Sequence, residues 1–237
     1  MTRTVTNSYS LPVHQQISEM LIREIAAGRM IDGEKLPPER QMAASLGVAV
    51  GTLRKALADL QAKGLLDRIQ GSGNYVRWQP DVASVYAMFR LELAEGGGLP
   101  TARMLSVERL PRPIEIPLCG SSGEAHRIRR LRSLGGKPAA VEEIWLDGNF
   151  ARAIAPEDLS DSLYLYYRKA LGFWIARAED RVGVGEVPGW APAEFGLPAG
   201  AAVGYVERIG WAQDGGRAEF SRTWFDHTVA RYVARLR

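Results

Sequence analysis

Near the start of the chain, three short segments with helical spacing of apolar residues follow one another, and each ends at a glycine. They span residues 11–27, 37–46 and 49–63. Two segments with β character, 65–69 and 74–78, then flank a glycine-containing turn. Three helices and a hairpin in this order predict a winged helix-turn-helix.

The third helical segment has an exposed face that begins with a short side chain and continues with basic ones. Its apolar residues repeat at the spacing of one buried face: Leu53, Ala56, Leu57 and Leu60. The opposite face carries Gly51, Arg54 and Lys55. In a winged helix-turn-helix this helix enters the DNA major groove, where a glycine permits close approach and basic side chains reach phosphates or guanine edges. For the helix alone, an ordinary solvated face is an equal alternative.

The turn of the hairpin and the distribution of charge favour DNA binding. Gly71, Ser72 and Gly73 permit a tight wing tip whose backbone can approach a phosphate or the minor groove. Residues 1–78 carry ten Lys and Arg against seven Asp and Glu, whereas residues 79–237 carry 20 of each. All of the net positive charge therefore lies in the first third, which indicates an anionic partner such as double-stranded DNA.

The run LPPERQMAASLGVAVGTLRKALADLQAKGLLDRIQGSGNYV resembles the DNA-binding domain of the GntR family of bacterial transcription regulators. The resemblance covers about residues 11–78 and implies DNA contacts by Arg40 and Arg54 and a phosphate contact by Thr52. Family members commonly carry an arginine where this chain has Val50, so we expect Val50 to contact a thymine methyl instead. The expected DNA-binding residues are Arg40, Val50, Gly51, Thr52, Arg54, Lys55, Gly71, Ser72 and Gly73.

The rest of the chain reads mainly as strands. A change of composition places a linker at residues 79–83, which divides the chain into domains 1–78 and 84–237. In the second domain, strand patterns occur in EAHRIRRLRSL, KPAAVEEIWL, AAVGYVERIGWAQ and RAEFSRTWF, and helical spacing in SLYLYYRKAL.

The segments RRLRSLGGKPAAVEEIWL, SLYLYYRKALGF and GLPAGAAVGYVERIGWAQDGGRAEFSRTWF resemble successive blocks of the UTRA domain of HutC-like GntR regulators. This resemblance covers about residues 84–235. It implies an α+β, chorismate lyase-like domain around an antiparallel sheet, which binds a small-molecule effector and pairs with its copy in a homodimer.

Two arginines on one strand are the main candidates for holding the effector. Arg130 and Arg132 are two residues apart, so both leave the same face and can grip a phosphate or carboxylate. The alternative from spacing alone is that they are solvated or form salt bridges, as arginines on a strand face usually do. A two-residue loop at Gly135-Gly136 would set Glu142 opposite Arg129, and a three-residue loop would set it opposite Arg130. The family pattern places this acid in the pocket, which favours the longer loop.

Further candidates come from the later blocks. Ser162 stands where a helix begins and offers an anion free backbone N–H groups, or acts as a plain N-cap. Glu219 and Ser221 share one strand face, and Phe220, Arg222 and Trp224 take the other. Tyr164 is included in the site, although packing in the core or at a dimer interface is its alternative role, as for Trp145 and Trp211. The expected effector-binding residues are Arg130, Arg132, Glu142, Ser162, Tyr164, Glu219 and Ser221.

Several classes of function are disfavoured. The lone Cys119 cannot form an intramolecular disulfide, and His14, His126 and His227 share no metal-ligand spacing, so no metal or cofactor is expected. The chain has no apolar run long enough for a bilayer and no signal-peptide pattern, which places it in the cytoplasm. An enzyme acting on a small carboxylate is the alternative, but no nucleophile and base form a recognisable motif. The sequence therefore predicts a repressor that binds a pseudo-palindromic operator as a homodimer and is released by a small anionic metabolite.

Overall fold

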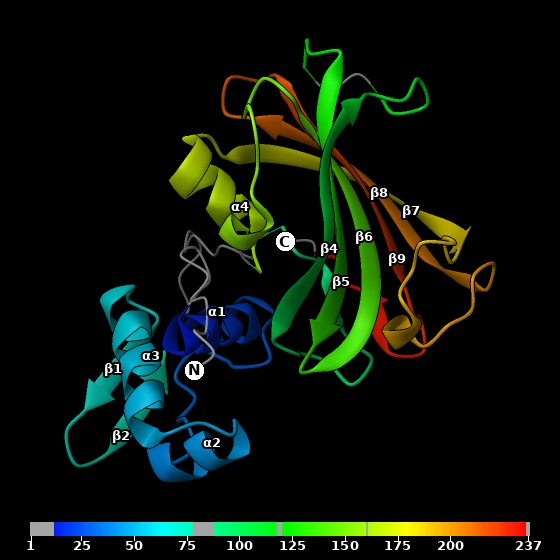
Figure 1. Ribbon diagram of the computed structural model, residues 1–237. Coiled ribbons are helices and arrows are strands. Elements are labelled where there is room, and N and C mark those ends of the chain that lie inside the picture. The colour runs from blue at the N-terminus through cyan, green and yellow to red at the C-terminus, as the bar shows by residue number, and fades with distance from the viewer. Residues whose placement is uncertain (1–11, 78–87, 118–119, 160, 236–237) are drawn as a thin grey trace, which may run out of the picture. The chain divides into compact units, whose positions relative to one another are not determined.

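The computed structural model describes residues 12–77, 88–117, 120–159 and 161–235 (Figure 1). It divides into two compact units, an N-terminal unit that includes residues 12–77 and a C-terminal unit from Arg90 to Val233. The expected linker, residues 79–83, and Cys119 lie outside the described residues. The exact domain boundaries therefore stay a prediction.

The N-terminal unit is the winged helix-turn-helix that the sequence predicts. Its elements are α1 (Val13–Ala26), α2 (Glu39–Ser45), α3 (Val50–Ala62), β1 (Leu66–Ile69) and β2 (Gly73–Val76). The apolar stripes of α1 and α3 meet in one core with the base of the hairpin, whose buried members include Ile17, Leu21, Leu53, Leu57, Leu60 and Val76. The hairpin register runs from Leu66 opposite Val76 to Ile69 opposite Gly73, which leaves a three-residue wing tip.

The C-terminal unit is built on a curved antiparallel sheet of six strands (Figure 1). The strands, in the order β4-β5-β6-β9-β8-β7, are β4 (Pro100–Pro111), β5 (Glu124–Leu134), β6 (Lys137–Asp147), β9 (Arg217–Phe225), β8 (Ala202–Ala212) and β7 (Ile175–Glu186). A separate pair joins β3 (Leu91–Leu93) to β10 (Ala230–Tyr232). Short helical turns are η1 (Pro156–Asp158), α4 (Leu163–Tyr166), η2 (Tyr167–Leu171) and η3 (Ala193–Phe195). The expected α+β class is confirmed.

Strand alternation gives the sheet two different faces. One face includes two buried apolar clusters, the first of Leu131, Val141, Val187, Phe195, Val203 and Trp224 and the second of Ile116, Ala125, Trp145 and Phe220. The opposite face carries buried polar side chains: Arg130, Arg132, Glu142, Glu219 and Ser221. Trp145 is thus a core residue, and Phe220 and Trp224 point away from Glu219 and Ser221, as expected.

The hairpin between β5 and β6 has the expected pairing of Arg130 with Glu142, but not the expected loop. Leu134 pairs with Lys137, so the loop holds only Gly135 and Gly136, both with positive φ, and the predicted three-residue loop is wrong. A bulge shifts the register next to Pro138, which has no N–H to give the ladder. Beyond the bulge, Glu142 lies opposite Arg130, as predicted.

The helical segment that begins after Ser162 is less regular than its spacing indicates. One α-helical turn, α4, passes into a π-helical turn, η2, and Gly172 ends it in the left-handed region with φ of 73°. A buried tyrosine, Tyr167, begins the π-helical turn and points toward the polar face of the sheet. This short element lies over the part of the polar face that carries Glu219.

Candidate functional site

The exposed face of α3 matches the surface expected to meet DNA. Gly51, Arg54 and Lys55 are exposed, and Thr52 is half-buried. A β-carbon at Gly51 would meet no atom within 4 Å outside the adjoining backbone of its own helix, so packing within the chain does not require a glycine there. Val50 is half-buried and packs against the core, so a contact with a thymine methyl would use only part of its side chain.

The wing and the start of α2 supply the other expected contacts. Gly71 and Gly73 have φ of 74° and 137°, values that favour glycine, and they bracket the exposed Ser72. The Ser72 hydroxyl is 2.7 Å from the Tyr75 hydroxyl, which steadies the wing tip. Arg40 is exposed on α2. The structure does not test whether these residues touch DNA, so their roles stay predictions.

One acidic residue on this surface escaped the sequence analysis. Glu39 begins α2 and accepts a hydrogen bond at 2.6 Å from Nε of Arg54 on α3 and another at 3.1 Å from Nη2 of Arg68 on β1. The hydrogen bond from Arg54 is the main reason that the pKa of Glu39 lies below its ordinary value. From the sequence, Glu39 looked only like an acid that favours a helix start.

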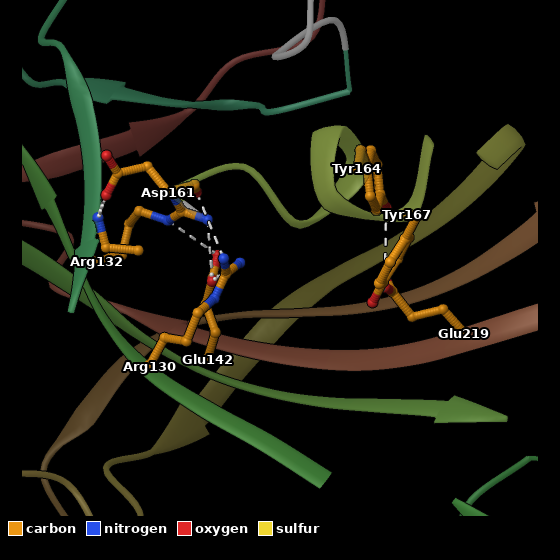
Figure 2. Close-up of polar contacts among 8 residues, drawn as sticks. Arg130, Arg132, Glu142, Asp161, Tyr164, Tyr167 and Glu219 are labelled. Atoms are coloured by element: carbon orange, nitrogen blue, oxygen red, sulfur yellow. Dashed lines mark hydrogen bonds and ion pairs between the residues drawn. The ribbon is translucent and has the colours of Figure 1, made fainter. Parts of the chain in front are cut away.

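In the C-terminal unit, Arg130, Arg132 and Glu142 form one buried cluster (Figure 2). Arg130 Nη2 donates to Glu142 Oε2 at 2.6 Å, and Arg132 donates to the same carboxylate at 3.2 and 3.4 Å. Both guanidiniums also reach the backbone oxygen of Asp161, at 2.8 Å from Arg132 and 3.4 Å from Arg130. The Asp161 carboxylate accepts from the backbone N–H of Ala102. The cluster thus joins three strands to the segment that leads into α4.

The charges in this cluster do not balance within the three side chains. Burial alone raises the pKa of Glu142, but the charges and hydrogen bonds of Arg130 and Arg132 outweigh it and lower that pKa to about 2. Two guanidiniums therefore share one carboxylate. Nε of Arg130 is buried and has no hydrogen-bond partner within the described part of the chain. The three side chains together carry one positive charge more than negative, and Arg130 keeps a donor that no described residue accepts from.

A second group of polar side chains lies further along the same face (Figure 2). The Tyr167 and Tyr164 hydroxyls donate to the Glu219 carboxylate at 2.6 and 3.3 Å. Burial, followed by the nearby Glu219 charge, raises the pKa of both tyrosines. Ser162 is the N-cap of α4, and its hydroxyl accepts from the backbone N–H of Leu165. The structure thus supports the N-cap alternative for Ser162, and its effector contact stays a prediction.

Three residues that the sequence analysis missed extend this polar face. Arg208 lies opposite Ser221 in the sheet register and forms a two-pronged ion pair with Asp180, at 2.5 and 2.6 Å. Tyr232 on β10 donates to the same Asp180 carboxylate at 2.5 Å. Ser221 itself is buried. No local pattern marks these contacts because they depend on the pairing of strands distant in sequence.

Among the described residues, no three His, Cys, Asp or Glu side chains gather where a metal ion could bind. Within the same residues, the helices are too short or too polar to cross a membrane.

Two family models match this chain. The model "Bacterial regulatory proteins, gntR family" matches residues 13–76, and the model of the UTRA domain matches residues 95–231, more than half of the chain. The chain belongs to the GntR family. Each match falls within one of the two regions assigned from sequence motifs.

Individual relatives agree with this assignment to the GntR family. The HTH-type transcriptional regulator SmoD of Agrobacterium fabrum is 64% identical over 228 residues, which cover 96% of this chain and 97% of SmoD. The HTH-type transcriptional repressor NagR of Bacillus subtilis is 24% identical, over 95% of this chain and 96% of NagR. These relatives are transcription regulators, and the expectation that this GntR-family chain is a regulator rather than an enzyme is confirmed.

Solved structures share the fold of this GntR-family chain. The crystal structure of the possible transcriptional regulator YydK from Bacillus subtilis has a TM-score of 0.54 at 20% identity and covers 96% of this chain and 100% of that one. The ligand-binding domain of a putative GntR-family regulator from Bordetella bronchiseptica has a TM-score of 0.55 at 24% identity, and covers 62% of this chain and 96% of that one.

Proposed function

We propose that this regulator is a repressor that binds a pseudo-palindromic operator as a homodimer and releases it when a small anionic metabolite binds. The observation that carries the proposal is the buried pair Arg130 and Arg132, which share the single carboxylate of Glu142. An effector with a phosphate or carboxylate group would offset the excess charge. The relative NagR, whose name describes a repressor, supports the direction of control.

The same cluster suggests how effector binding changes the structure of the C-terminal unit. Both arginines hold the backbone oxygen of Asp161, immediately before Ser162 and α4. An anion that draws the guanidiniums toward itself competes with this oxygen and loosens the entry to α4. In the proposed switch, the C-terminal units of the dimer then rearrange. The two N-terminal DNA-binding units consequently no longer match the spacing of the operator half-sites.

The proposed homodimer follows from the small size of one DNA-binding unit. One recognition helix contacts few bases, and two-fold symmetry doubles that contact on a pseudo-palindrome. The proposal also includes a cytoplasmic location, where bacterial DNA is found. Selection of bound sequences from random duplexes should yield an inverted repeat with half-sites about one helical turn apart, or a multiple of it. Sedimentation that shows a monomer bound to a single half-site would contradict the dimer.

The effector class has its own test. A thermal-shift screen with sugar phosphates, organic acids and amino-acid derivatives should find an anion that stabilises the protein, by about 2.7 kcal/mol at 100 times its dissociation constant. The same compound should release the selected operator. Stabilisation only by uncharged compounds would contradict an anionic effector.

Replacing each of the two basic residues of α3 with alanine, in separate variants, distinguishes contacts with bases from contacts with phosphates. Arg54→Ala should weaken operator binding by roughly 1–3 kcal/mol and leave binding to unrelated DNA nearly unchanged. Lys55→Ala should weaken binding to all sequences alike and reduce the salt dependence. Titration of operator and scrambled duplexes at several salt concentrations measures both. Equal loss of specificity in the two variants would show that the assigned helix face is wrong.

A further inference from the structure

Glu39 connects the recognition helix to the wing. One oxygen of its carboxylate binds Arg54 of α3, and the other binds Arg68 of β1. The Glu39 side chain is 17% exposed, whereas those of Arg54 and Arg68 are 61% and 51% exposed. A sheltered acid thus anchors two largely exposed arginines that belong to different elements.

This anchoring leaves the atoms of Arg54 that read a base unused. The hydrogen bond to Glu39 engages Nε, and the two terminal nitrogens of Arg54 bond to no other described residue. Those two nitrogens form a fork that matches the O6 and N7 acceptors of guanine. Arg54 can therefore keep its bond to Glu39 while it contacts a base.

The charge of Glu39 indicates what the contact contributes. A carboxylate near DNA phosphates weakens binding to every sequence, because phosphate contacts dominate affinity. An anchored arginine, however, gives up less side-chain freedom when it meets the correct base. The contribution of Glu39 is thus to selectivity rather than to overall affinity.

We propose that Glu39 is a positioning residue for operator recognition, which holds Arg54 ready for base contact and fixes the wing through Arg68. This inference rests on the proposed operator binding. It adds Glu39 and Arg68 to the residues that determine how the DNA-binding unit reads its site.

The test compares Glu39→Gln with a matched control, Asp67→Asn. Asp67 is also an acid that pairs with an arginine of the same unit, because it accepts a hydrogen bond from Arg77 Nε at 2.6 Å. Each change removes one negative charge: Glu39→Gln removes the charge that pairs with Arg54 and Arg68, and Asp67→Asn the charge that pairs with Arg77. Glu39→Gln should lower the ratio of operator to scrambled-DNA affinity by about three- to tenfold, with binding to scrambled DNA unchanged or tighter. Asp67→Asn should leave the ratio within about twofold.

Two further variants separate positioning from charge and from folding. Glu39→Asp keeps the charge but is too short to reach both arginines, so it should also lower the ratio. In an Arg54→Ala background, Glu39→Gln should have no further effect on the ratio, because the residue that it positions is gone. Circular dichroism and the thermal midpoint verify folding in each case.

Equal tightening on both DNAs by Glu39→Gln would show that Glu39 only repels phosphate, and would overturn the proposal. So would a loss of selectivity that persists without Arg54. A wild-type protein that prefers no DNA sequence would instead contradict the proposed function itself.

Discussion

Replacing Glu142 with glutamine is expected to lower the free energy of unfolding of the C-terminal unit by about 3–5 kcal/mol. The change leaves Arg130 and Arg132 buried side by side with no carboxylate between them, and their mutual repulsion is unscreened by water. The ion pair as a whole need not stabilise the fold, but the loss of one partner leaves uncompensated buried charge. Urea unfolding, followed by the fluorescence of the tryptophans, measures the loss.

Glu108→Gln is the matched control for this effect. Glu108 also pairs with an arginine of the same sheet, Arg127, at 2.9 Å, but its side chain is 43% exposed. Removal of this surface pair should cost less than about 1 kcal/mol. Similar losses for the two variants would show that burial of the Glu142 cluster does not determine its contribution.

The acid dependence of the same variant checks the cause. The pKa of Glu142 is lowered to about 2 in the folded protein, from an ordinary value of 4.5. Its charged form therefore stabilises the fold fully above the ordinary value, and this stabilisation is lost as the pH falls toward 2. The difference in stability between the wild type and Glu142→Gln should stay constant from pH 7 to about 5 and shrink below it. A constant difference down to pH 3 would contradict the ion-pair origin.

Local patterns were sufficient for the elements with one clearly apolar face. The expected helix at 49–63 contains α3, whose buried residues Leu53, Ala56, Leu57 and Leu60 repeat with the helical period. The expected strand at residues 124–134 is β5, which is buried along most of its length. The edge strands β4 and β7 were missed. Each has a neighbour on one side only, and Ile175 is the single buried residue among those of β7, so neither carries a strong apolar alternation.

The candidate sites depend on contacts that no local pattern specifies. Spacing alone placed Arg130 and Arg132 on one face, but the position of Glu142 depended on a bulge at Pro138 rather than on loop length. Glu39 and Arg54 are 15 residues apart, and Asp180 and Arg208 are 28 apart. Such pairs follow from helix packing and strand register, which the sequence pattern leaves open.

Replacing Arg132 with alanine is expected to abolish the response to effector and to leave operator affinity without effector nearly unchanged. Arg132 makes the shorter bond to the Asp161 oxygen, at 2.8 Å, and is one of the two proposed anion ligands. The variant keeps the balanced pair of Arg130 and Glu142, so we expect it to fold more readily than Glu142→Gln. The measurement is operator titration with and without an anion identified by the thermal-shift screen.

The size of the lost response has a lower limit set by linkage. An effector that releases operator tenfold must bind the two arrangements of the dimer with a difference of about 1.4 kcal/mol, and operator must weaken effector binding by the same factor. Both couplings should disappear together in Arg132→Ala. Arg129→Ala is the control, because Arg129 leaves the opposite face and pairs with Glu143 at 2.7 Å, so the response should persist. If Arg132→Ala loses operator binding outright in a folded dimer, the arginine supports the DNA-binding arrangement itself, and the proposed switch is wrong.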